Sequence, residues 1–133
     1  MTKQKLLIVD DQDDLRKMLK IALGYGKYQL FEAGDGETAL ALARAERPDV
    51  ILLDVMMPGN LDGIAVCHAI KADPELAGCF VIMLTARGQA SDYASGDAAG
   101  ADAYMVKPFS PAKLVEVVEM RTKLAKPVRG YGF

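Results

Sequence analysis

Four short apolar runs constrain this chain most, because each of them ends on a polar residue that can take part in chemistry. In chain order the runs lead into Asp10-Asp11, Asp54, Thr85 and Lys107-Pro108. Apolar runs of about four to eight residues between turn signals are typical of strands buried on both faces, and such strands form parallel sheets covered by helices. The pattern therefore predicts an α/β fold.

Segments with helical periodicity separate these strands. Leu15, Met18, Leu19, Ala22 and Leu23 follow the i, i+3, i+4, i+7, i+8 spacing of an amphipathic helix. We expect a second strand at Tyr28–Ala33, a third helix at Ile64–Lys71, and a last helix capped by Ser110 with Pro111 in its first turn. Gly88 to Gly100 is rich in Ala, Ser and Gly, which fits either a short, weakly held helix or an element that shifts between two positions.

Length and composition limit the remaining possibilities. The 133 residues fit one domain, expected at 1–124, with an irregular tail at 125–133. A net charge of −2 gives no reason to expect nucleic-acid binding, and no apolar run approaches the roughly 18 residues that cross a membrane. Cys67 and Cys79 lack metal-ligand spacing, so we interpret them as reduced thiols of a cytoplasmic protein.

The polar strand ends predict a single site. In open parallel sheets, ligands bind outside the carboxyl ends of the strands, so these side chains should meet at one edge. Asp11 and Asp54 suit direct ligation of Mg2+, and Asp10 is close enough to act through water. Because four apolar residues hold Asp54 in place, its carboxylate could attack phosphorus and become an aspartyl phosphate.

The other strand ends would hold the three oxygens of such a phosphoryl group. We expect Mg2+ to take one oxygen and Lys107 a second, and the Thr85 hydroxyl with the Ala86 backbone N–H to take the third. Each charge-assisted contact contributes on the order of 1.5–3 kcal/mol, which is enough to move a weakly held segment.

With these residues in view, the chain resembles the receiver domain of two-component response regulators from about Lys5 to Leu124. The resemblance is carried by Asp10-Asp11, the Leu53-to-Pro58 segment, Leu84-Thr85-Ala86, Gly100-Ala101-Asp102 and Lys107-Pro108-Phe109. It implies a flavodoxin-like, doubly wound (βα)5 fold: a five-stranded parallel sheet of order 2-1-3-4-5 with helices on both faces.

The resemblance also implies a role for individual residues. Asp54 would accept the phosphoryl group, and Asp10 and Asp11 would hold Mg2+, or Mn2+, with the Met56 backbone carbonyl as a further ligand. Thr85 would be the switch hydroxyl, Tyr104 the switch aromatic, and Lys107 the partner of the phosphoryl group. The Lys107-Pro108 bond would be cis. The loop from Met57 to Gly63 departs from the family in being one residue longer than usual.

The resulting hypothesis is a stand-alone receiver that a histidine kinase or histidine phosphotransfer protein phosphorylates. It would catalyse only its own phosphorylation and dephosphorylation, and would be a monomer or weak homodimer. A downstream protein would bind the surface of the fourth helix, fifth strand and fifth helix, around Tyr93, Tyr104, Lys113 and Val115. A phosphorelay intermediate, or a fragment of a longer regulator with a DNA-binding or enzymatic output, are close alternatives.

Two other classes of protein fit the residues less well. An aspartyl-phosphate phosphatase generally places a second acid two residues after its nucleophile, where this chain has Met56, which cannot transfer a proton. A flavin-binding domain would need a phosphate-cradling loop after the first strand, and the acidic stretch from Asp10 to Asp14 would repel a phosphate there.

Overall fold

Parallel strands form the centre of the structure, a computed structural model that describes residues 4–24, 28–57, 59–86, 99–123 and 131–132. The strands are β1 (Gln4–Val9), β2 (Tyr28–Ala33), β3 (Val50–Asp54), β4 (Phe80–Ala86), β5 (Ala103–Lys107) and β6 (Tyr131–Gly132), in the order β2-β1-β3-β4-β5-β6. The described helices are α1 (Asp13–Ala22), α2 (Gly36–Glu46), α3 (Gly63–Ala72) and α5 (Pro111–Lys123). The predicted parallel sheet and its 2-1-3-4-5 order are confirmed.

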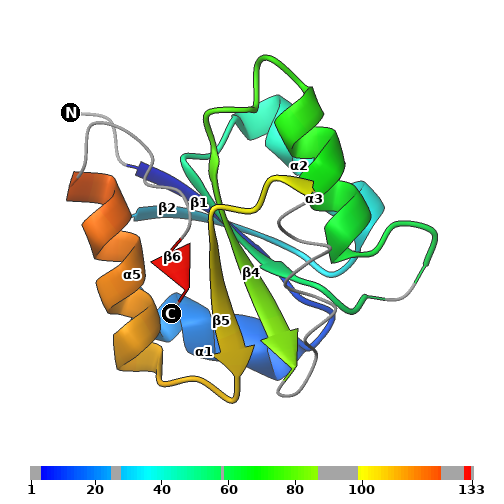
Figure 1. Ribbon diagram of the computed structural model, residues 1–133. Helices are drawn as coiled ribbons and strands as arrows, with labels where there is room; N and C mark the ends of the chain where they lie inside the picture. The colour runs from blue at the N-terminus through cyan, green and yellow to red at the C-terminus, as the bar shows by residue number, and fades with distance from the viewer. Residues whose placement is uncertain (1–3, 25–27, 58, 87–98, 124–130, 133) are drawn as a thin grey trace.

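Helices cover both faces of the sheet (Figure 1). α1 and α5 pack on one face, where Leu19 and Leu114 meet the strands, and α2 and α3 pack on the other, with Leu40 and Ile70. Strand β3 contributes to both cores because successive side chains point to opposite faces. Ile51 lies in the α2–α3 core, for example, whereas Leu52 lies in the α1–α5 core.

Several element boundaries agree with the expectations from sequence. β2 spans the predicted residues. α3 begins one residue earlier than predicted, because Asp62 caps it through a hydrogen bond from the Ala65 N–H, and it ends one residue later, at Ala72. At α5 the Lys113 N–H donates to the Ser110 hydroxyl over 3.4 Å, as the capping signal predicted. Of the Gly88–Gly100 segment, all but the last two residues lie outside the described ranges, so both interpretations of it stay predictions.

The prediction of an irregular tail is wrong at residues 131–132. These residues form the two-residue strand β6, which pairs in parallel with β5 so that Ala103 faces Tyr131 and Tyr104 faces Gly132. The physical reason is that β5 would otherwise be the edge of the sheet, with unpaired backbone N–H and C=O groups that can bind a further strand. The other tail residues lie outside the described ranges. Within those ranges, no helix has the length and apolarity that crossing a bilayer requires.

Candidate functional site

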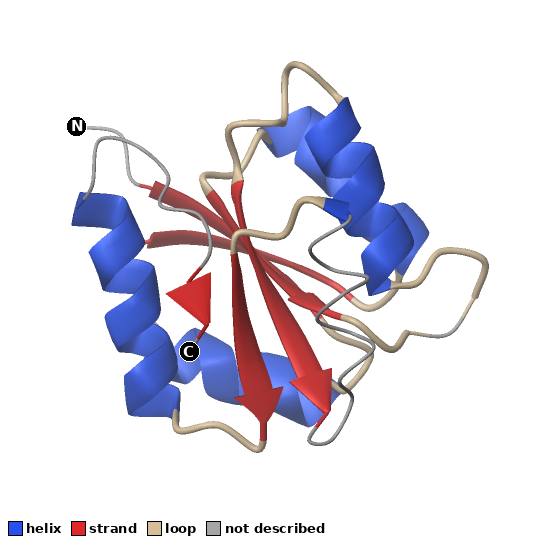
Figure 2. Ribbon diagram, viewed as in Figure 1, coloured by secondary structure: helices blue, strands red, loops and turns tan. Residues whose placement is uncertain are grey.

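The fold brings the polar strand ends together at the carboxyl edge of the sheet, toward which the arrows of β4 and β5 point (Figure 2). Asp10 follows β1, and Asp54 is the last residue of β3. Thr85 is the last residue but one of β4, and Lys107 is the last residue of β5. The register pairs Asp54 with Leu84 and Thr85 with Val106, so the strands end at nearly the same level. The predicted convergence is confirmed.

Three carboxylates face one another at this edge. One oxygen each from Asp10, Asp11 and Asp54 can be chosen so that all lie within 4.8 Å of one another. Asp10 and Asp54 are buried, whereas Asp11 is exposed. Because a hard divalent cation prefers carboxylate oxygens and usually keeps several waters, two buried acids with one exposed acid fit Mg2+ well. The residues present therefore fit the cation that the sequence predicted.

Lys107 lies between two of these acids. Its Nζ is 2.8 Å from Asp10 Oδ2 and 3.4 Å from Asp54 Oδ1. Burial lowers the pKa of Lys107, but the hydrogen bond from Lys107 to Asp10 and the charges of Asp54 and Asp10 outweigh burial and raise the pKa above its ordinary value. Lys107 is therefore a cation held against the Asp10 and Asp54 carboxylates. The peptide bond to Pro108 is cis, as the resemblance implied.

Asp54 is the acid whose ionisation is most disturbed. Burial, followed by repulsion from the Asp10 carboxylate, raises its pKa to about 6 against the opposing effects of Lys107 and the Met56 N–H. That N–H donates to Asp54 Oδ1 over 3.3 Å. The Asp54 carboxylate is thus oriented, buried, and still ionised at neutral pH, which is the state that a nucleophile requires.

Two further predicted residues surround the carboxylates. Thr85 is 1% exposed, and its hydroxyl makes no hydrogen bond with any described atom. Tyr104 is also buried and belongs to the core under α2 and α3. A buried hydroxyl without a partner is costly, so Thr85 is suited to bind an oxygen that arrives with a ligand. The switch roles of Thr85 and Tyr104, the Ala86 N–H contact and the Met56 carbonyl ligand stay predictions, and Tyr93 lies outside the described residues.

Thr85 allows a direct test of this unpaired hydroxyl. We expect Thr85→Val to raise the free energy of unfolding by about 1 kcal/mol without phosphodonor, because valine has a similar shape and removes a buried group that lacks a partner. Urea unfolding measures this change. Thr38→Val is the matched control and should be destabilising, since the Thr38 hydroxyl donates to Asp35 Oδ2 over 3.1 Å. A loss of stability in Thr85→Val would contradict the prediction.

The sequence did not predict the residues that fix the backbone and orientation of the acids. Asp10 Oδ1 accepts a hydrogen bond from the Gln12 N–H over 2.9 Å, and the Arg16 guanidinium binds the Asp10 backbone carbonyl. Gly63 lies against the backbone of Asp54. The helical spacing of Arg16 from Asp13 is visible in the sequence, but the contact of Arg16 with Glu32 on β2 has no local signal.

Comparisons with known proteins agree with this geometry. The family described as "Response regulator receiver domain" matches residues 6–119. "Probable transcriptional regulator ycf27" of Guillardia theta is 46% identical over 93% of this chain and 48% of that protein. "DNA-binding response regulator MtrA" of Mycolicibacterium smegmatis is 41% identical over 91% of this chain and 51% of that protein. The chain thus spans about half the length of the curated relatives it matches.

Solved structures show the same fold. A putative response regulator from Chloroflexus aurantiacus has a TM-score of 0.85 at 36% identity, over 92% of this chain and 100% of that chain. The Vibrio cholerae chemotaxis protein CheY4 has a TM-score of 0.82 at 33% identity, over 90% of this chain and 98% of that chain. The range matched by the family, residues 6–119, contains the acids, the hydroxyl and the ammonium group of the site.

Proposed function

The chain belongs to the response regulator receiver domain family, and we propose that it works as a Mg2+-dependent phosphoryl acceptor in which Asp54 is the acceptor. The observation that supports this most directly is the position of the Asp54 carboxylate. It is buried, it is oriented by the Met56 N–H, and it lies beside both Lys107 and the other two acids. Asp10 is also buried and lies beside Lys107, but both of its carboxylate oxygens are already bound, Oδ1 by the Gln12 N–H and Oδ2 by Lys107. In Asp54 the Met56 N–H and Lys107 both contact Oδ1.

The acceptor reaction follows from this arrangement. An oxygen of the ionised Asp54 carboxylate attacks the phosphorus of a phosphohistidine, so that an O–P bond forms while the P–N bond breaks and the imidazole leaves. Lys107 offsets the negative charge that collects on the transferred group. Mg2+, when held by Asp10, Asp11 and Asp54, would supply further charge stabilisation and keep the phosphoryl group in line. The phosphate donor would be a histidine kinase or a histidine phosphotransfer protein.

The switch would then pass from Asp54 to the output surface. A phosphoryl oxygen offers the Thr85 hydroxyl the partner that it lacks among the described residues. Tyr104 lies one strand away and is already buried, which suits an aromatic that follows the movement of Thr85. The changed surface around β5 and α5, including Lys113 and Val115, would bind the downstream partner.

The proposal admits two forms of output. In the first, the receiver surface itself binds a partner protein, directly or as a phosphorelay intermediate. In the second, the receiver controls a DNA-binding segment of a longer chain. The names of the ycf27 and MtrA relatives, and the half of their length that this chain spans, favour the second form. Nucleic-acid contact would then belong to that segment.

Intact-protein mass spectrometry tests the acceptor. We expect incubation with Mg2+ and a small acyl phosphate to add one phosphoryl group, and expect no addition in EDTA or in Asp54→Asn. An adduct of the same size in Asp54→Asn would assign the acceptor to another residue. The absence of an adduct in protein that binds Mg2+ by titration would overturn the proposal.

A further inference from the structure

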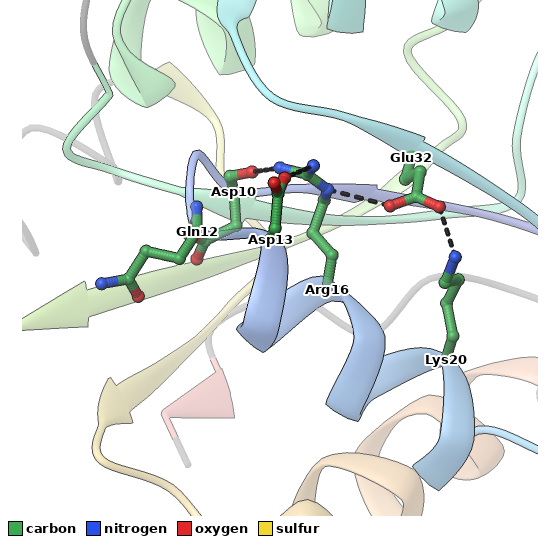
Figure 3. A network of polar contacts seen from close by, with 6 residues as sticks. All are labelled: Asp10, Gln12, Asp13, Arg16, Lys20 and Glu32. Carbon is green, nitrogen blue, oxygen red and sulfur yellow. Dashed lines mark hydrogen bonds and ion pairs between the residues drawn. The ribbon is translucent and has the colours of Figure 1, made fainter.

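Arg16 lies beside Asp10, one of the three clustered acids, and joins three elements through one guanidinium group (Figure 3). Its Nη1 donates to the backbone carbonyl of Asp10 over 2.5 Å, and its Nε donates to Glu32 Oε1 on β2 over 2.9 Å. Its Nη2 forms an ion pair with Asp13 in the first turn of α1. The Arg16 side chain is 15% exposed, and its bond to the Asp10 carbonyl is half-buried, whereas its two carboxylate partners are exposed to solvent.

One of these contacts, to the Asp10 carbonyl, lies on the turn from Asp10 to Gln12, which carries two of the three acids, and the other two anchor the guanidinium to β2 and α1. Arg16 holds the Asp10 carbonyl, while the Asp10 carboxylate accepts from the Gln12 N–H over 2.9 Å and from Lys107 over 2.8 Å. Gln12 is the N-cap of α1, yet its own side chain makes no capping bond. Backbone bonds from the Asp10 N–H to Ala33 and from the Arg16 N–H to Gln12 also hold the turn, and the side chains that fix it are those of Asp10 and Arg16. Asp11 lies inside that turn.

The chemistry of the contact requires arginine. Three acceptors from separate elements surround one planar group, and a guanidinium offers five donors in a fixed fork whereas lysine offers a single ammonium. Gly34 leaves room for the guanidinium because it has no side chain. A Cβ at this position would lie 3.3 Å from Arg16 Nη1, which is a tight contact. Lys20 binds the same Glu32 from the next turn of α1 but makes no described contact with Asp10.

We propose that Arg16 is a positioning residue for the metal site: by fixing the Asp10–Gln12 turn, it directs the Asp10 and Asp11 carboxylates toward Asp54 so that they bind Mg2+ together. Arg16 itself touches backbone and structural carboxylates and none of the reacting atoms. The inference depends on the proposed function only in taking Mg2+ as the cation of this site. Groups that orient metal ligands in this way typically contribute a factor of about 10–100 to metal affinity.

The inference is testable because an effect of the Arg16 charge and an effect of its fixing the turn change Mg2+ affinity in opposite directions when Arg16 is removed. If Arg16 acted only through its positive charge, removing it would strengthen Mg2+ binding, since like charges repel. If Arg16 acts by fixing the turn, removing it weakens Mg2+ binding, and lysine, which keeps the charge, does not restore it.

Calorimetric titration of the full chain with MgCl2 separates these effects in wild type, Arg16→Met, Arg16→Lys and Lys20→Met. We expect both Arg16 variants to raise the Kd for Mg2+ by about tenfold or more, and Lys20→Met to stay within about twofold of wild type. Lys20→Met is the matched control because it removes a cation from the same helix and from the same partner, Glu32. At saturating Mg2+, phosphorylation of the Arg16 variants should return to the wild-type extent.

Arg16→Lys is the deciding variant, because it keeps the stem and the charge and is expected to fold even if Arg16→Met does not. A wild-type or tighter Kd in folded Arg16→Lys, checked by circular dichroism, overturns the inference, and a Kd raised as expected supports it. A wild-type chain that binds Mg2+ but accepts no phosphoryl group overturns the proposed function instead. The comparison of Mg2+ affinities then still decides the role of Arg16.

Discussion

Gly63→Ala should lower the free energy of unfolding by about 3 kcal/mol and impair phosphorylation of Asp54 as well. A Cβ at position 63 would lie 2.0 Å from the Asp54 carbonyl oxygen and 2.8 Å from the Val55 Cα. Both neighbours are backbone atoms, so neither can rotate away as a flexible side chain would. The first turn of α3 would have to move off the end of β3, or Asp54 would have to move with it.

The contact also explains why stability and function should change together. The Gly63 N–H donates to the Val55 carbonyl over 3.0 Å, which ties the start of α3 to the residue after Asp54. Any shift that relieves the overlap therefore disturbs the backbone that orients the Asp54 carboxylate. We expect urea unfolding to show the loss of stability and mass spectrometry to show slower phosphorylation at fixed Mg2+.

Gly78→Ala is the matched control for this substitution. Gly78 is exposed, and a Cβ there would meet no heavy atom within 4 Å, so the same chemical change should alter stability by no more than about 0.5 kcal/mol. If Gly63→Ala and Gly78→Ala were equally stable, the close approach of α3 to the end of β3 would not exist in solution.

The site residues that could be predicted from the sequence are those at the carboxyl ends of strands. Asp54 and Lys107 end buried parallel strands, and because parallel strands end at one edge, their meeting follows from the apolar runs alone. The same logic placed Thr85 near them. The roles of Tyr104 and Met56 came only from the family resemblance, since neither residue type carries that chemistry by itself.

Contacts between elements distant in sequence could not be predicted in this way. Arg16 looks like an ordinary polar position of α1 until the fold places Glu32 beside it. Asp102 was visible only as part of a family motif, whereas in the structure it accepts from the Val81 N–H over 2.9 Å and pairs with Lys71 at 2.7 Å. Such pairs form when the packing of the elements brings the two residues together, and a local sequence pattern does not predict that packing.

Asp54→Asn should raise the free energy of unfolding by about 2–3 kcal/mol at pH 8 in EDTA, and should change it little at pH 4. The native pKa of Asp54 is about 6, and an aspartate in an unfolded chain titrates near 3.9. Between these values the native state binds more protons than the unfolded state, so the contribution of Asp54 to stability falls as pH rises. Asparagine has nearly the same shape, carries no charge at any pH, and so avoids this loss.

Urea unfolding of both proteins from pH 4 to pH 8 measures the effect, which should grow mainly between pH 4 and pH 6. Asp35→Asn is a control of opposite sign, because hydrogen bonds from the Thr38 N–H and hydroxyl lower the pKa of Asp35, so its carboxylate stabilises the fold once ionised. Mg2+ should narrow the difference between wild type and Asp54→Asn, since the cation binds the ionised acid. A stability difference that does not change with pH would contradict the prediction. It would mean that burial does not raise the pKa of Asp54 in the native state.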